Sequence, residues 1–237
     1  VVTGGAGGLG LVFCAWLAKR GAGCVVLIGR REAPGEAEAE AVAQIERETG
    51  AEVRYACADV ADAVRLQAAV GGAAARGELR GVLHCAGVSY PAPVPHQDVV
   101  HMRVAFSPKV SGSWNLHCLA SSRDGAELFV LFSSIASFLG VFGQANYAAA
   151  NAFMDGLARM RAHIGLSGLS VSWGPWSDIG MASRSAFLAR GMEQGGHLAL
   201  QPDVGVECLE WLLVRRKDTE RRWPANQIGR ASCRERV

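Results

Sequence analysis

The sequence predicts an α/β fold in which a doubly wound parallel sheet is flanked by helices. Short apolar runs alternate with longer helical patterns along the chain, which is typical of βαβ units. The runs at 24–28 and 128–132 contain no charged residue, as expected for strands that are buried on both faces. A glycine-rich segment at 3–10 separates the first apolar pair from the first helical pattern. These observations favour a parallel sheet that begins at the first residues of the chain.

The expected strands follow one another at regular intervals. The first is truncated, because only Val1 and Val2 precede the glycine-rich segment, whereas a central strand usually has about five or six residues. The other five are expected at 24–28, 52–58, 81–84, 128–132 and 169–173.

Helical patterns occupy most of the stretches between these runs. The first expected helix ends near residue 20, and the others span 36–49, 61–76, 98–121, 147–163 and 204–213. Gly50 ends the second helix, and Pro108 is expected to interrupt the helix at 98–121 because proline lacks the N–H group. The segment 91–95 holds three prolines and is expected to be a loop. The segment 177–200, with four glycines, is expected to be a mobile lid.

Length and composition narrow the class of protein. A chain of 237 residues suits one large domain, and a net charge of +2 gives no reason to expect a nucleic-acid partner. No apolar run approaches the roughly 20 residues of a membrane span, and no leader precedes the first residue, so a cytoplasmic location is expected. Seven cysteines without a Cys-x-x-Cys pair favour neither a disulfide framework nor a metal site.

The last eleven residues differ from the rest of the chain. The segment 227–237 has neither apolar periodicity nor cap signals, and it resembles a translated sequencing adapter. We therefore divide the chain into a domain at 1–226, incomplete at its N-terminus, and a non-native tail at 227–237. The alternative is a genuine basic tail.

The segment 3–10 has the glycine pattern of a dinucleotide-binding loop between a strand and a helix. Its glycines permit a tight turn and bring the backbone close to a pyrophosphate, which the N-terminal amides of the helix then bind. The fold class is therefore a Rossmann-type sheet. The residues of this loop expected to bind the cofactor are Thr3, Gly4, Gly5, Gly8, Leu9 and Gly10.

The end of the second strand indicates which dinucleotide binds. An acidic residue there would bind the ribose hydroxyls of NAD, but this chain has Arg30 and Arg31, which suit the 2′-phosphate of NADPH. The alternative is two solvated arginines. Ligands also bind at the carboxyl ends of the next strands, where Asp59 and other candidates lie; Asp59 could equally cap the following helix. These further candidates are Asp59, Val60, Cys85, Ala86 and Gly87.

Four polar residues are candidates for ketone reduction, which needs a proton donor beside the carbonyl oxygen. Ser134 follows the fifth strand, and Tyr147 opens the next helix 13 residues later. Asn151, four residues after Tyr147, shares its helix face. Lys109 lies upstream, and a nearby ammonium is expected to lower the pKa of the Tyr147 phenol. Singly, each of these residues could be a cap, a packing residue or a surface charge.

Taken together, these motifs resemble the ketoreductase (KR) domain of modular type I polyketide synthases, a branch of the short-chain dehydrogenase/reductase superfamily. The resemblance covers nearly all of residues 1 to about 213. One feature separates this branch from free-standing reductases: Asn151 stands where those have a lysine. The matching stretches are 3–10, 84–87, 108–110, 132–134, 143–152, 173–176 and 180–181.

The resemblance implies a role for each candidate. Tyr147 would donate the proton, Ser134 would bind the substrate oxygen, Lys109 would tune the tyrosine and anchor the cofactor ribose or a relay water, and Asn151 would support that relay. Pro175 would contact the cofactor, whereas Trp176, Met181 and the lid would line the substrate pocket.

The resemblance also implies a substrate and partners. The substrate would be a β-ketoacyl thioester on the phosphopantetheine arm of an acyl carrier protein, with other synthase domains in the parent chain. The alternatives are a free-standing reductase of a diffusible ketone and an inactive cofactor-binding fragment. Residues 88–91 lack the Leu-Asp-Asp of one stereochemical type, and Leu139 stands where the opposite type has Trp, so the handedness of the product stays open.

Overall fold

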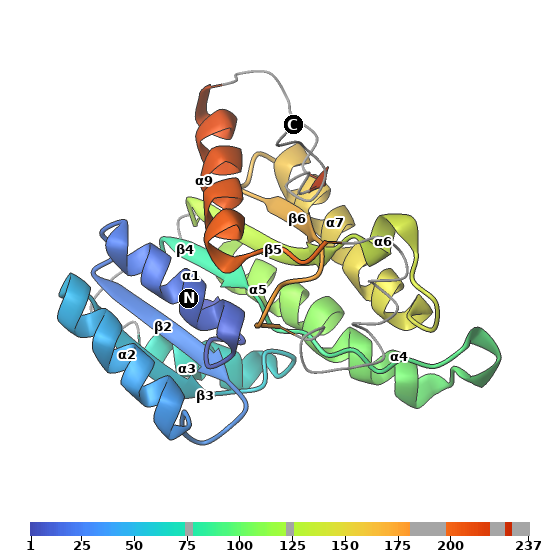
Figure 1. Ribbon diagram of the computed structural model, residues 1–237, viewed down its shortest axis with the longest axis horizontal. Helices are drawn as coiled ribbons and strands as arrows, with labels where there is room; N and C mark the ends of the chain where they lie inside the picture. The colour runs from blue at the N-terminus through green and yellow to red at the C-terminus, as the bar shows by residue number, and fades with distance from the viewer. Residues whose placement is uncertain (74–77, 122–125, 181–197, 219–225, 229–237) are drawn as a thin grey trace.

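The computed structural model describes residues 1–73, 78–121, 126–180, 198–218 and 226–228, and every structural statement below concerns these residues. They form a seven-stranded sheet in the order β3-β2-β1-β4-β5-β6-β7, with every neighbouring pair parallel (Figure 1). This order confirms the Rossmann-type fold. The strands are β1 (Val2–Thr3), β2 (Cys24–Gly29), β3 (Glu52–Cys57), β4 (Gly81–His84), β5 (Leu128–Ser134), β6 (Leu169–Trp173) and β7 (Asn226–Ile228).

The six expected strands are all present, and the seventh was missed. The short β1 still pairs with both neighbours, since Val2 lies opposite Leu27 of β2 and Leu83 of β4. β7 pairs with β6, and two of its three residues belong to the segment interpreted as a tail. So short a strand, without an apolar run, gives no signal in the sequence. Residues 229–237 lie outside the described residues.

Helices connect the strands, and those of three turns or more match the expected positions; α2 has the expected bounds, and the ends of the others are shifted. A proline can begin a helix because the first N–H groups need no partner, which explains the start of the last helix at Pro202. The helices are α1 (Gly8–Lys19), α2 (Glu36–Thr49), α3 (Ala63–Ala73), α4 (Val99–Phe106), α5 (Gly112–Ser121), α6 (Ala136–Leu139), α7 (Ala145–His163) and α9 (Pro202–Asp218).

Of the two expectations about proline-containing segments, one needs correction and the other is confirmed. A 3₁₀ turn, η1 (Val94–His96), extends into the segment expected to be a loop, because Pro95 lies at its start, where no N–H donor is needed. The interruption expected near Pro108 is confirmed: α4 ends at Phe106, and a wider π-helical turn, η2 (Ser107–Ser111), joins it to α5. Pro108 has no N–H group to donate to a regular α-helix at this position, and π-helical turns are frequent at functional sites.

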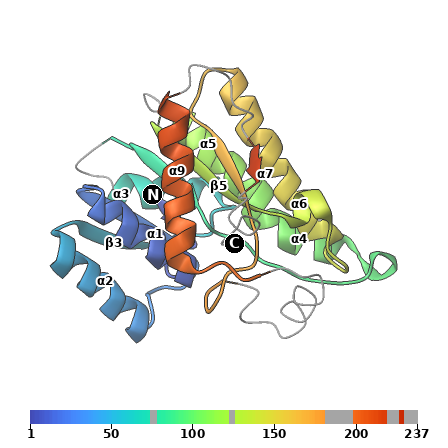
Figure 2. The same cartoon turned by 45° about the horizontal axis from the view of Figure 1, so that its top comes forward.

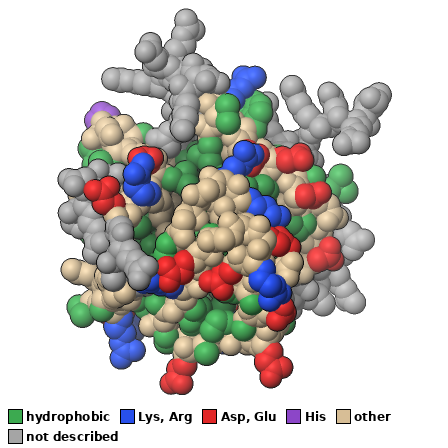
Figure 3. Space-filling view, turned by 90° about the vertical axis from the view of Figure 1, so that its left-hand side faces the viewer, with side chains coloured by type: hydrophobic (Ala, Val, Ile, Leu, Met, Phe, Trp, Pro, Cys, Tyr) green, Lys and Arg blue, Asp and Glu red, His purple; other side chains and the backbone are tan. Residues whose placement is uncertain are grey.

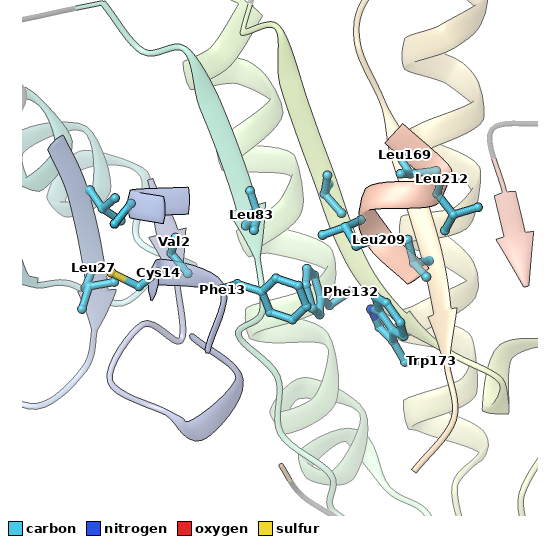
Figure 4. Close-up of a cluster of buried hydrophobic side chains, with 14 of the residues drawn as sticks. Val2, Phe13, Cys14, Leu27, Leu83, Phe132, Leu169, Trp173, Leu209 and Leu212 are labelled. Carbon is cyan, nitrogen blue, oxygen red and sulfur yellow. The ribbon is translucent and has the colours of Figure 1, made fainter. Parts of the chain in front are cut away.

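The sheet is covered on both faces (Figures 1 and 2). Alternate residues of a strand point to opposite faces, so Leu27 of β2 belongs to the cluster on the face covered by α1 and α9, whereas Ile28 belongs to the cluster on the face covered by α3 and α5. Figure 4 shows the first cluster, in which Phe13 of α1 lies against Phe132 of β5, their ring centroids 4.8 Å apart. Burial on both faces is the reason why these strands read as unbroken apolar runs.

The surface beside α1, α2 and β3 carries interspersed acidic and basic side chains (Figure 3). Arg47 and Glu40 of α2 form one ion pair, with 2.7 Å between guanidinium and carboxylate, and Lys19 approaches Glu48 at 4.0 Å. A search of the described helices for one long and apolar enough to span a bilayer finds none.

Candidate active site

The glycine-rich loop between β1 and α1 is tightly folded. Gly4 has a φ of +66°, a conformation that side chains rarely adopt. Gly10 lies directly over the turn, and a Cβ atom there would stand 2.5 Å from the Cα atom of Gly5. Only glycine fits these positions, so the loop backbone stays open to a ligand at the start of α1, where the first amides have no partner within the helix.

A cavity of about 410 Å³ lies at the carboxyl ends of β1 to β4. Seven of the expected cofactor residues line it: Thr3, Gly4, Arg30, Asp59, Val60, Ala86 and Gly87. The glycine cradle and the arginine in the lining fit the phosphate groups of a dinucleotide. Asp59 also accepts a hydrogen bond from the Ala61 amide at 2.9 Å, so it caps the turn before α3 as well.

The other expected cofactor residues lie elsewhere. Gly5 packs against Leu27, and Gly8 faces Ile179. Burial raises the pKa of the Cys85 thiol, and the Cys85 amide donates to the Thr3 carbonyl at 3.2 Å. The residues that do not line this cavity are Gly5, Gly8, Leu9, Gly10, Arg31, Cys85 and Pro175.

Helix α4 and η2 supply one wall of the cavity, which the sequence reasoning missed. Arg103, Val104 and Ser107 line it together with Pro108. Nothing in their spacing indicates this contact, because it depends on how α4 packs across the ends of the strands. The only available signal is their place just before Lys109.

The two arginines after β2 have different environments. The Arg31 guanidinium forms an ion pair with Glu38 of α2 at 2.7 Å, which raises the pKa of Arg31. Arg30 lines the cavity, and within the described part of the chain no hydrogen bond or ion pair is formed by its side chain. Arg30 is therefore the arginine available to a ligand.

A buried histidine links the glycine-rich loop to η2. His84 Nε2 lies 3.0 Å from the Pro108 carbonyl, which can only accept, so Nε2 carries the proton. Nδ1 therefore accepts from the Thr3 hydroxyl at 2.6 Å. Thr3 Oγ1 in turn accepts from the Ala86 amide at 3.4 Å. This chain of hydrogen bonds requires a neutral imidazole. Burial is the larger cause that lowers the pKa of His84 to about 3, and the positive charge of the nearby Lys109 is the smaller one.

The buried His84 is expected to make the fold sensitive to acid. Below about pH 6.5 the unfolded chain binds a proton at this position, but the folded chain does so only near pH 3. The free energy of unfolding should therefore fall as pH decreases through this window, by up to about 1.4 kcal/mol per pH unit. Chemical denaturation at pH 6.5 and pH 4.5 measures the slope for the wild type and for His84→Gln.

The control variant is His163→Gln, which changes an exposed histidine at the end of α7. It should keep the wild-type slope, whereas His84→Gln should have a smaller one. Equal slopes in the wild type and His84→Gln would refute the role given to His84.

Lys109 projects from η2 toward the end of β5. Its side chain is buried, Nζ donates to the Phe132 carbonyl at 3.0 Å, and Nζ lies 5.2 Å from the centroid of the Tyr147 ring. Burial lowers the pKa of Lys109 to about 7, against the opposing effects of Cys85 and Asp155. An amine that titrates near neutral pH suits proton transfer.

Tyr147, Ser134 and Asn151 meet Lys109 at this point. Tyr147 and Asn151 lie one turn apart on α7, and Asn151 Nδ2 donates to the Tyr147 carbonyl at 2.7 Å. Ser134 ends β5, and its hydroxyl accepts from the Ala136 amide at 3.2 Å and hydrogen-bonds the Tyr147 phenol. Asn151 Oδ1 is buried without a hydrogen-bond partner among the described residues. The four residues expected to be catalytic therefore lie together.

The expected lowering of the Tyr147 pKa needs correction. Burial raises it to about 12, and hydrogen bonding with the side chains of Asn151 and Ser134 opposes this only in part. Lys109 does not lower the pKa of Tyr147 as expected, because its ammonium is itself desolvated and readily loses its charge. The phenol therefore stays protonated at neutral pH, as a proton donor must.

The expected substrate-pocket residues are placed only in part. Trp176 is buried and packs against Phe13 and Trp173, whose ring centroids lie 6.1 Å and 4.9 Å from its own. Leu139, at the end of α6, is exposed. Met181 and most of the expected lid, residues 181–197, lie outside the described residues.

Comparison with known proteins identifies the relatives of this chain. A model of the KR domain family matches residues 1–178. One component of the phenolphthiocerol/phthiocerol polyketide synthase of Mycobacterium tuberculosis is 41% identical over 185 residues, which are 77% of this chain and 8% of that protein. Polyketide synthase GfsA of Streptomyces halstedii is 38% identical over 211 residues, 88% of this chain and 3% of that protein. The chain thus spans a small part of these relatives.

Solved structures agree with these matches. The first ketoreductase of the tylosin polyketide synthase is 34% identical with a TM-score of 0.84, covering 96% of this chain and 47% of that one. An A-type ketoreductase from a modular polyketide synthase is 36% identical with a TM-score of 0.81, covering 86% and 43%. A short chain dehydrogenase from Mycobacterium paratuberculosis bound to NAD, at 23% identity and a TM-score of 0.77, shares the fold.

The fold and the cluster around Tyr147 define an oxidoreductase of the short-chain dehydrogenase type, a class that uses a nicotinamide cofactor. Within that class, the family match and the sequence identities given above decide to which family the chain belongs. The chain belongs to the KR domain family, whose solved relatives are ketoreductases of polyketide synthases.

Proposed function

We propose that this chain reduces the β-ketone of a β-ketoacyl thioester to the β-hydroxyacyl thioester, with NADPH as reductant. The observation that carries the proposal is the buried phenol of Tyr147 between Ser134 and Lys109, next to a cavity that fits a dinucleotide. Phenol, hydroxyl and amine are the groups that a carbonyl needs when it becomes an alcohol.

Thr3, Gly4, the start of α1 and Arg30 would hold the cofactor, which when bound supplies a hydride to the β-carbon. The Ser134 hydroxyl donates a hydrogen bond to the ketone oxygen and orients it. As negative charge develops on that oxygen, the Tyr147 phenol gives up its proton, and its pKa of about 12 keeps this proton in place until then. The Lys109 ammonium stabilises the resulting phenolate. Asn151 Oδ1 can hold a water molecule through which the proton is replaced.

The relatives support the substrate class. Because the chain spans 8% or less of the synthases described above, the carrier and the neighbouring domains belong to the proposal. We propose that the ketone is presented on the phosphopantetheine arm of an acyl carrier protein, with other polyketide synthase domains in the parent chain. A cytoplasmic location stays a prediction from the sequence.

A comparison of substrates tests this function. NADPH oxidation by the full chain is measured with a β-ketoacyl thioester on a carrier protein, with the same acyl group on a short pantetheine thiol, and with a diffusible cyclic ketone. We expect turnover with both thioesters and a higher kcat/KM for the carrier-bound one. Turnover of the cyclic ketone alone would favour a free-standing reductase, and cofactor binding without any turnover would indicate an inactive fragment.

The different environments of the two arginines predict different effects on cofactor choice. Arg30→Ala removes a cavity-lining guanidinium, and since a charge-assisted hydrogen bond contributes about 1.5–3 kcal/mol, KM for NADPH should rise roughly 10- to 100-fold while KM for NADH hardly changes. Arg31→Ala, which breaks an exposed pair with Glu38, is the matched control and should change KM for NADPH no more than about threefold. An equal or larger effect of Arg31→Ala would overturn this assignment.

A further inference from the structure

Asp155 is a buried carboxylate that the proposed mechanism does not use. Its side chain lies on α7 and is 3% exposed. The Ser170 hydroxyl of β6 donates to Oδ1 at 2.6 Å, and the Ser137 hydroxyl of α6 donates to Oδ2 at 2.7 Å. A buried charge is costly unless it is hydrogen-bonded, so both serines are needed to keep this carboxylate inside the fold.

The position of Asp155 relates it to the catalytic cluster. Tyr147, Asn151 and Asp155 are spaced four residues apart and therefore share one face of α7. This face packs against the end of β5 and the start of α6, since the Ser133 hydroxyl also donates to the Asn151 carbonyl at 3.4 Å. Asp155 thus lies two turns from the phenol, on the surface that meets the segment containing Ser134.

Ser137 connects the carboxylate to the turn that contains Ser134. Its hydroxyl lies 2.9 Å from the Ser134 carbonyl and 2.7 Å from Asp155 Oδ2. The hydroxyl has one proton, and the charged carboxylate is the stronger acceptor. The turn from Ser134 to Ser137 is therefore fastened to α7 by a charge-assisted bond. Ser170, by contrast, fastens the same carboxylate to β6 and has no bond to this turn.

The charge of Asp155 also affects the cluster. Its carboxylate opposes the lowering of the Lys109 pKa by burial, as does Cys85. Among the described residues, four titratable groups interact with Lys109. They are His84 at the end of β4, Cys85 in the loop that follows, Asp155 of α7 and the ring of Tyr147. Asp155 is the carboxylate in this group, and its negative charge favours the ammonium form of Lys109.

We propose that Asp155 is a positioning residue: through Ser137 it holds the Ser134 turn against α7 and thereby sets the spacing between the Ser134 and Tyr147 hydroxyls. The inference rests on the proposed ketone reduction. It assigns to Ser137 and Asp155 a role in catalysis that acts through Ser134, without contact with the substrate.

The test compares two variants that each remove one hydrogen bond from the same carboxylate. Ser137→Ala releases the Ser134 turn, and Ser170→Ala releases β6. In the full chain, with NADPH and a β-ketoacyl thioester, Ser137→Ala should lower kcat about tenfold while KM for NADPH stays within about twofold of wild type. Ser170→Ala should lower Tm at least as much but leave kcat within about twofold. Ser137→Thr, which keeps the hydroxyl, should restore most of kcat.

Equal losses of kcat in the two alanine variants would overturn the inference, because Ser137 would then contribute only to stability. Crystal structures of both variants provide a readout that needs no turnover: the distance between the Ser134 and Tyr147 hydroxyl oxygens should change in Ser137→Ala and stay the same in Ser170→Ala. If the wild type itself reduces no thioester, the proposed function fails, and this structural comparison still decides whether Ser137 positions Ser134. An unchanged distance in Ser137→Ala contradicts the inference.

Discussion

Tyr147→Phe is expected to lower kcat about 10³-fold while the chain still binds NADPH with nearly wild-type affinity. The substitution removes one oxygen and keeps the ring that lies 5.2 Å from Lys109 Nζ, so the packing at the start of α7 should persist. Without the phenol proton, the oxygen of the reacting ketone must take its proton from water. Steady-state kinetics and fluorescence titration with NADPH measure the two effects separately.

Tyr90→Phe provides the matched control, because it removes the same atom from a tyrosine that is 47% exposed. This variant should keep most of the wild-type kcat. A Tyr147→Phe variant that retained more than a tenth of wild-type turnover would show that another group donates the proton.

Lys109→Met is expected to lower kcat about 100-fold, since it removes the buried charge beside the phenol. It should also abolish a pH dependence. The pKa of Lys109 is lowered to about 7, so in the free enzyme the ammonium form is lost as pH rises through 7, and kcat/KM for the ketone should fall there. Tyr147, with a pKa of about 12, does not titrate in this range. The Met variant should show a flat profile between pH 6 and pH 9.

The same substitution should increase stability. A lowered lysine pKa means that the folded chain disfavours the charged form, and this cost is complete below pH 7 and disappears as pH rises toward 10.5. Lys109→Met removes the cost, so Tm at pH 6 should rise while kcat falls, a common trade between stability and activity. The control, Lys19→Met, changes an exposed lysine and should affect neither quantity. A Met variant with wild-type kcat would contradict the role of Lys109.

The sequence allows the sheet to be predicted because each central strand is apolar on both faces, as Leu27 and Ile28 of β2 illustrate. The short elements escaped prediction for the opposite reason. α6 has four residues and β7 three, so neither is long enough for a periodic pattern to be recognised. The π-helical turn at Pro108 packs against α7, and no local pattern specifies that tertiary contact.

In the candidate site, too, the sequence predicts what local motifs specify and misses what tertiary contacts determine. The glycine-rich loop is a local motif, and Tyr147 and Asn151 are related by helical spacing, so residues alone indicate them. Lys109 lies 38 residues before Tyr147, so no helical spacing relates the two, and the resemblance to KR domains supports their pairing. The wall contributed by Arg103, the packing of Trp176 in the core and the direction of the Tyr147 pKa shift all depend on tertiary contacts and burial, which the sequence alone does not reveal.

The central claim is that the cluster around Tyr147 directs reduction of a β-ketone by a nicotinamide cofactor, and isotope transfer tests it most directly. The full chain is incubated with a β-ketoacyl thioester and NADPH that carries deuterium at the transferring position of the nicotinamide ring, and the product is examined by mass spectrometry and NMR. The account predicts one deuterium, bound to the β-carbon of a β-hydroxyacyl thioester, and no such product from Tyr147→Phe on the same time scale. An unreduced thioester, or deuterium at any other carbon, would contradict it.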